Sequence, residues 1–178
     1  MKGKIPLVVF VILVIWTGIG AIVLSSQNQN IQGNTGQVWV EIERGDGLLK
    51  QLEGQLKFTT AAQQQAIHEI TTARNNILAA QKVGDLQKAT AAANNVQVTL
   101  ENYPDFGLSQ VQEGVLEETA GSFNRVAYAQ YLLIQAQTSY NGWRIVFFPD
   151  MLFFHHIGVL GSGSNPNQQL NPPGLNES

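Results

Sequence analysis

Residues 5–24 read IPLVVFVILVIWTGIGAIVL, and this run contains no charged side chain. A helix of this length rises about 30 Å, which matches the hydrocarbon core of a bilayer. Lys2 and Lys4 precede the run, and no basic residue follows it before Arg44. Basic residues favour the cytoplasmic side of a span. We therefore expect a single transmembrane helix, with residues 1–4 in the cytoplasm and the domain that follows on the extracytoplasmic side.

A cleaved secretory signal is the competing interpretation of the same run. Such signals have an apolar core of about 7–15 residues and end in small residues of the A-x-A type. Here the run is longer, and Ala21-Ile22-Val23 is a poor cleavage signature. An uncleaved anchor is therefore favoured. Residues 25–36, SSQNQNIQGNTG, are polar and uncharged, and they predict a flexible linker between bilayer and domain.

Composition limits what the rest of the chain can be. The 178 residues include 44% hydrophobic and 13% charged side chains, with a formal net charge of -3. This is enough for one domain and an anchor. The acidic balance argues against nucleic acid as a partner, because phosphates demand clustered Lys and Arg. The chain has no cysteine, which excludes disulfides and thiolate chemistry.

Apolar periodicity predicts four helices over residues 37–160. In the first, Leu48, Leu49, Leu52 and Leu56 form one face, although Gly45 and Gly47 predict that it is bent or starts late. The second begins with a capping box at Thr60 and ends before Gly84. Its expected buried stripe contains Ala66, Ile67, Ile70, Ala73, Ile77 and Ala80.

Asp85 announces the third helix, and Pro104 stops it. A seam with heptad spacing, as in a coiled coil, contains Leu86, Ala89, Ala93, Val96, Leu100 and Tyr103. The fourth helix opens with a capping box at Ser109 and is expected to continue to about Tyr140 as the longest of the four. Its expected face contains Val111, Val115, Phe123, Val126, Leu133 and Tyr140. The fold class predicted is all-α: a transmembrane helix followed by an antiparallel four-helix bundle with a long last helix.

Short motifs in this region resemble those of the LemA family. They are Thr72-Ala73-Arg74, then Asn124-Arg125-Val126-Ala127, then Tyr140-Asn141, and finally Phe148-Pro149 before an apolar stretch. The resemblance covers roughly Trp39 to Leu160. The family's first-helix motif is degenerate here, as Arg44-Gly45-Asp46-Gly47-Leu48. The resemblance implies a membrane-tethered four-helix domain of prokaryotic origin, without an established biochemical activity.

No group of residues has the spacing of a catalytic, metal or cofactor site. His155 and His156 are adjacent, so on a helix they point about 100° apart and do not share a metal. His68-Glu69 lacks a second histidine four positions later. Glu113, Glu117 and Glu118 lie along one side of the fourth helix, as on a solvated face. We therefore expect no enzyme activity, no cofactor and no metal.

Residues 143–160, WRIVFFPDMLFFHHIGVL, are unusually apolar for the end of a bundle. One interpretation is that the segment folds back and covers the open end of the bundle, with Pro149 ending the helix before it. The other is an exposed interaction surface for lipid or protein. The candidate residues of that surface are Trp143, Phe147, Phe148, Phe153 and Phe154. Residues 161–178 are rich in Gly, Pro, Asn and Ser and are expected to be disordered.

Two function hypotheses from different classes remain open. The first is a noncatalytic scaffold or adaptor of the cell envelope, with the lipid bilayer and an unidentified membrane or envelope protein as partners. The LemA resemblance supports this hypothesis, because the family is associated with membrane proteases and envelope maintenance. The second is an extracytoplasmic small-molecule-binding sensor module, since helical bundles hold ligands between facing helices.

Overall fold

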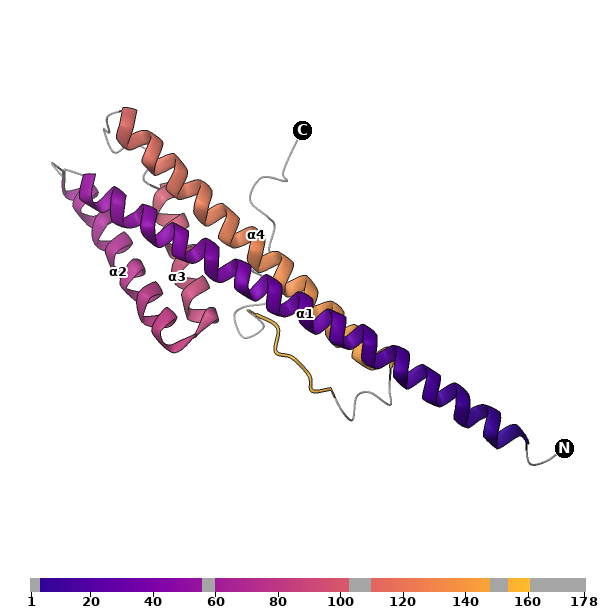
Figure 1. Ribbon diagram of the computed structural model, residues 1–178. Helices are drawn as coiled ribbons and strands as arrows, with labels where there is room; N and C mark the ends of the chain where they lie inside the picture. The colour runs from indigo at the N-terminus through magenta and orange to yellow at the C-terminus, as the bar shows by residue number, and fades with distance from the viewer. Residues whose placement is uncertain (1–3, 56–59, 103–109, 148–153, 161–178) are drawn as a thin grey trace. The chain divides into compact units, whose positions relative to one another are not determined.

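The structure is a computed structural model, and it describes residues 4–55, 60–102, 110–147 and 154–160. These residues form four helices and no strand: α1 (Lys4–Gln55), α2 (Ala61–Val83), α3 (Leu86–Asn102) and α4 (Gln110–Val146) (Figure 1). The all-α fold class predicted from the sequence is therefore confirmed. Several of the helix boundaries expected from the sequence differ from those in the structure.

The chain divides into two compact units. The anchor unit contains residues 1–35 and 132–166, and the bundle unit contains residues 36–131. Each of the two long helices, α1 and α4, contributes to both units. The C-terminal part of α4 groups with the N-terminal part of α1 in the anchor unit.

The expected flexible linker over residues 25–36 is wrong, because α1 continues through it as one helix of 52 residues. The reason is a heptad repeat. Leu24, Ile31, Val38 and Leu52 are all buried, and they fall at multiples of seven positions from one another. Ile31 therefore keeps the polar tract in register with the apolar positions on either side. The apolar run and the first bundle helix are one element. At 52 residues α1 is the longest of the four helices, whereas α4 has 37 residues.

The glycines of α1 also differ from the prediction, since they neither bend nor delay the helix. Gly45 is buried, and a Cβ at that position would lie 3.0 Å from the ring of Phe123 on α4. The missing side chain makes room for Phe123, which is itself fully buried. Gly47 faces open space. On the predicted face of this helix Leu49 and Leu52 are buried and Leu48 is half-buried, while Leu56 lies outside the described residues.

The α2–α3 hairpin follows the sequence prediction closely (Figure 1). Thr60 accepts a hydrogen bond from Gln63 N, and the Gln63 side chain accepts one from Thr60 N, which confirms the capping box. Gly84 adopts the left-handed conformation with φ 67° and ends α2. The expected positions are buried, except that Ile67 and Leu86 are half-buried and Tyr103 lies outside the described residues. The buried residues are Ala66, Ile70, Ala73, Ile77, Ala80, Ala89, Ala93, Val96 and Leu100.

Helix α4 runs six residues past its expected end at Tyr140. Its predicted face is buried at Phe123, Val126, Leu133 and Tyr140, whereas Val115 is half-buried. The predicted capping box at Ser109 lies outside the described residues, as does the expected disordered tail over residues 161–178.

Candidate functional site

The arginine of the Thr72-Ala73-Arg74 motif joins α2 to α1 within the bundle unit. Arg74 Nε donates to Asp46 Oδ1 at 2.8 Å, and Arg74 Nη1 donates to Glu53 Oε2 at 2.9 Å. Thr71 Oγ1 donates to the other oxygen of Glu53 at 3.0 Å. All three charged side chains are about four-fifths buried, with 18–20% of their surface exposed. One guanidinium therefore bridges two carboxylates that lie two helical turns apart on α1.

The electrostatics of this fork favour the charged form of Arg74. Burial on its own would lower the pKa of the guanidinium. Hydrogen bonds and charge from Asp46 and Glu53 outweigh burial and raise the pKa of Arg74 above its ordinary value. The guanidinium is thus held as a permanent cation between two acids, and its donors are directed inward to α1.

The arginine of the Asn124-Arg125-Val126-Ala127 motif joins α4 to α1. Arg125 Nε donates to Glu41 Oε2 at 3.1 Å. The neighbouring Asn124 joins α4 to α3, because its Oδ1 accepts from Gln97 Nε2 at 2.8 Å. Both polar residues of this motif therefore contact a neighbouring helix.

A fourth polar contact joins α2 to α3. Thr99 on α3 donates to Glu69 on α2, at 3.5 Å. In the bundle unit, polar side-chain contacts therefore join α1 to α2, α2 to α3, α3 to α4, and α4 to α1. We call these four contacts the bridge ring. Each of the four helices is thus held to two others by polar side chains as well as by apolar packing.

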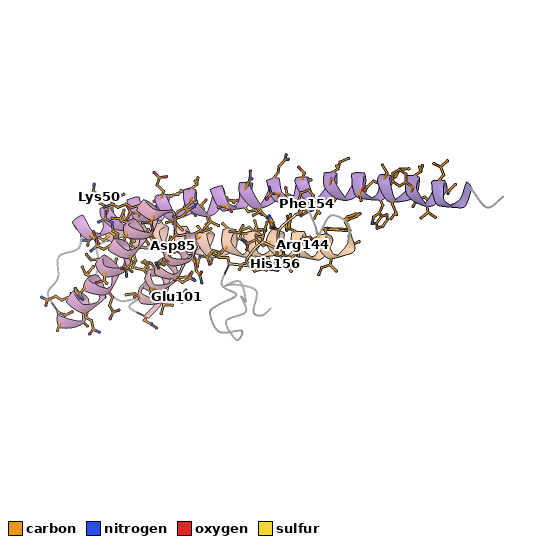
Figure 2. The ribbon with its side chains drawn as sticks, turned by 90° about the horizontal axis from the view of Figure 1, so that it is seen from below. Lys50, Asp85, Glu101, Arg144, Phe154 and His156 are labelled. Carbon is orange, nitrogen blue, oxygen red and sulfur yellow. The ribbon has the colours of Figure 1, made fainter. Side chains whose placement is uncertain are left out.

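In the anchor unit, residues 154–160 run back along the end of α4 (Figure 2). Asn141 makes a double contact: its Nδ2 donates to Ile157 O at 2.8 Å, and its Oδ1 accepts from Ile157 N at 3.1 Å. The Tyr140 hydroxyl donates to His155 O, and Arg144 Nη1 donates to Phe154 O, both at 3.3 Å.

Gln137 Oε1 completes this arrangement by accepting from Leu160 N at 2.8 Å. Four side chains on neighbouring turns of α4 therefore bind the backbone of residues 154–160. They are Gln137, Tyr140, Asn141 and Arg144. We call this set the clamp. The Tyr140-Asn141 motif belongs to the clamp.

Three of the five residues predicted as an interaction surface lie in the described part of the chain, and they differ in exposure. Phe147 is buried, with its ring 5.2 Å from Trp16 on α1 and 6.0 Å from Trp143. Trp143 is 43% exposed, and Phe154 is half-buried. Phe148 and Phe153 lie outside the described residues.

The segment does fold back, as one of the two interpretations predicted. Its described contacts are made to α4, through residues 154–160, and to α1, through Phe147 and Trp16, inside the anchor unit. Trp16, inside the apolar run, offers Phe147 a large aromatic surface in this packing.

The remaining predicted candidates are dispersed. His68, His155 and His156 are exposed on separate segments, and Glu118 makes a long, exposed ion pair with Arg44 at 3.6 Å. Among the described residues, no three His, Asp or Glu side chains gather closely enough to hold a metal ion.

Sequence reasoning missed the acidic partners on α1 and the clamp. Glu41, Asp46 and Glu53 lie 84, 28 and 21 positions from the arginines that bind them, so no local pattern joins them. Glu41 and Glu53 had one available signal, which is that they flank buried heptad positions of α1.

The fold and these contacts define an all-helical protein with an apolar N-terminal helix and motif arginines that bridge its helices. The sequence profile of the LemA family matches residues 34–162, which is most of the chain, and the chain belongs to this family. No curated protein and no solved structure matches the chain significantly.

Proposed function

We propose that this protein is a membrane-anchored, noncatalytic scaffold or adaptor of the cell envelope. The observation that carries the proposal is the bridge ring. The motif arginines, Arg74 and Arg125, are the side chains best suited to bind an anionic substrate, and both bind carboxylates of the same chain instead. The bundle unit is therefore braced internally, and its outer surface is available to a partner.

The anchor is supported by the surface of α1. From Leu7 to Ile15 every large apolar side chain is exposed, at 47–64% of its surface. This part of α1 is long and apolar enough to belong to a membrane span. Such a helix is more stable in lipid than in water, because nine consecutive apolar side chains would otherwise face solvent. We place Lys2 and Lys4 on the cytoplasmic side, as the basic-residue bias favours.

The outer surface of the bundle unit has several exposed apolar side chains, among them Val40 and Val83, and we choose one on α3 and one on α4 as positions to probe for a partner protein. Val98 on α3 and Tyr128 on α4 are each more than half exposed. Isolated exposed apolar residues are common, so each is a place to probe and neither is a site in itself.

Site-specific photocrosslinking in intact cells tests the scaffold role. A photoreactive residue is placed at Val98 in one full-length variant and at Tyr128 in another, both at native abundance. We expect one discrete adduct that forms from one of these positions and not from the other, because a docked partner covers one face. The absence of an adduct from both positions would contradict the proposal.

The alternative of a small-molecule sensor is tested on the same protein by thermal unfolding across a metabolite panel. Under the scaffold proposal, no metabolite shifts the melting temperature. A reproducible rise with one compound would favour the sensor, since a ligand that binds only the folded state stabilises it.

A further inference from the structure

The end of α4 lies beside the part of α1 that we assign to the membrane. Trp16 is the twelfth residue of the apolar run 5–24, and its ring contacts Phe147. Further along, Asn34 Nδ2 donates to Leu132 O at 3.3 Å. These two contacts show that α1 and α4 run antiparallel within the anchor unit, with Phe147 level with Trp16.

The length of α1 shows how much of its apolar run has no part of α4 beside it. The residues from Ile5 to Trp16 rise about 18 Å, whereas a bilayer core is about 30 Å thick. The rest of a membrane crossing must therefore be supplied by the next two turns of α1. In these turns Gly20 and Leu24 are buried inside the anchor unit. A span that crosses the bilayer therefore brings its packing partner, the end of α4, into the hydrocarbon region.

The surface of α4 at this level suits lipid. Ile145 is 66% exposed, Val146 is 52% exposed, and Trp143 lies beside them. These three side chains lie within one turn of Phe147, which is level with Trp16 in the apolar run of α1. Aromatic and aliphatic side chains of this kind are typical of a helix end that enters the interface and the upper part of a leaflet.

The clamp meets part of the demand that lipid makes on irregular backbone. Nonhelical backbone at membrane depth is tolerated only where its polar groups are satisfied within the protein. Residues 154–160 are nonhelical, and the clamp binds the carbonyls of Phe154, His155 and Ile157 and the N–H groups of Ile157 and Leu160. Arg144 Nη1 donates to a backbone carbonyl, as charged residues near lipid often do, whereas the buried Nε of Arg144 has no hydrogen-bond partner in the structure.

We propose that the last two turns of α4, residues 141–147, are inserted into the leaflet at the Leu24 end of the span, where Trp143, Ile145 and Val146 contact acyl chains. The occupant of this apolar face is lipid, because the face lies at the level of Trp16, inside the apolar run that we assign to the membrane. The inference rests on the proposed membrane crossing of α1, and the experiment separates the two.

The three tryptophans of the chain provide the test. Full-length variants that each keep one tryptophan, with the other two changed to Phe, are reconstituted in phosphatidylcholine vesicles with or without bromine atoms on the acyl chains. Trp16 reports the span, Trp143 reports the end of α4, and Trp39 lies on α1 fifteen positions beyond Leu24. We expect brominated lipid to remove most of the emission of Trp16 and Trp143 and to leave that of Trp39 unchanged.

The outcomes distinguish the two claims. Loss of Trp16 emission with unchanged Trp143 emission would overturn the insertion of α4 while the membrane crossing stands. Unchanged emission from both would overturn the crossing and, with it, the insertion. If Trp143 is unquenched in pure vesicles but blue-shifted in native membranes, a protein covers the face, and the lipid proposal is wrong.

A second measurement avoids the tryptophan changes. The chain has no cysteine, so Ile145→Cys and Val98→Cys each provide a unique site for a nitroxide label. We expect the label at position 145 to be more accessible to oxygen, which dissolves in lipid, and the label at position 98 to be more accessible to a water-soluble nickel chelate. The same accessibility pattern at both positions would overturn the proposal.

Discussion

Replacement of Arg74 by Met tests whether the motif arginine acts as a structural bridge. Methionine keeps much of the apolar stem and removes the guanidinium, so Asp46 and Glu53 lose their shared cation. The two lost hydrogen bonds, at 2.8 and 2.9 Å, are charge-assisted. Bonds of this kind contribute about 1.5–3 kcal/mol each, and breaking a buried ion pair costs about 3–5 kcal/mol.

The exposure of the Arg74, Asp46 and Glu53 side chains determines how much the free energy of unfolding falls in Arg74→Met. With 18–20% of each side chain still exposed, water partly solvates the two orphaned carboxylates. We therefore expect Arg74→Met to lower the free energy of unfolding by about 2–4 kcal/mol, below the full cost of a buried pair. Arg74→Lys should recover only part of this loss, because one ammonium does not reproduce the guanidinium fork.

The assay is urea unfolding of the full-length protein in detergent micelles, followed by far-ultraviolet circular dichroism. Arg44→Met is the matched control, because Arg44 pairs with Glu118 at 3.6 Å and both side chains are more than half exposed. It should cost no more than about 0.5 kcal/mol. Equal effects of the two substitutions would refute the structural role of Arg74. So would a failure of Asp46→Asn combined with Glu53→Gln to rescue Arg74→Met.

Three further predictions concern the bundle unit. Leu100→Ala should lower the free energy of unfolding by about 2–5 kcal/mol in the same assay, whereas Asn94→Ala, which is exposed, should change it by no more than about 0.5 kcal/mol; equal values would show that the wrong face of α3 is buried. Gly47→Ala should stabilise α1 by up to about 1 kcal/mol, whereas Gly45→Ala should destabilise the protein because its Cβ would press on a buried ring; a stabilising Gly45→Ala would contradict that packing. Hydrogen bonds from the Lys88 backbone and side chain lower the pKa of Asp85. The stability that the Asp85 carboxylate contributes is therefore present above its unfolded pKa of about 3.9 and is lost as the pH falls through the folded value. The melting temperature of Asp85→Asn should converge on that of the wild type in acid, and a constant difference would contradict this.

Local patterns in the sequence were sufficient to predict the apolar span and the buried stripes of α2 and α3. Both depend on residues close together in the chain, such as Ile70, Ile77 and Val96, whose spacing directly reports a helix face. The caps of α2 were equally predictable, because Thr60 and Gly84 satisfy backbone groups within one turn.

The continuity of α1 was not predicted, because a polar tract with one apolar residue resembles a linker by composition. Ile31 decides the outcome through its register with Leu24 and Val38, and the benefit of burying it arises only when α4 is present. Gly45 was misjudged for a related reason. Helix propensity counts a glycine as a weak point, whereas tertiary packing uses the space it leaves.

The bridge ring and the clamp depend on partners far apart in sequence. The Arg125–Glu41 pair spans 84 positions, and nothing local marks Glu41 as its partner. The family motifs drew attention to Arg74, Arg125 and Asn141, but a motif alone does not say whether a residue binds a substrate or another helix. The geometry of these side chains is what supports a structural role.

Under the proposed scaffold role, the motif arginines hold the helices together and do not themselves contact the partner. The most direct measurement is in-cell photocrosslinking, from the position that yields the adduct, in a variant that combines Arg74→Met with Asp46→Asn and Glu53→Gln. This variant removes the three charges together and leaves no orphaned carboxylate, so it should melt close to the wild type. Our account predicts that the adduct forms with undiminished yield. Loss of the adduct from a variant that melts like the wild type would contradict it, because Arg74 would then contact the partner directly.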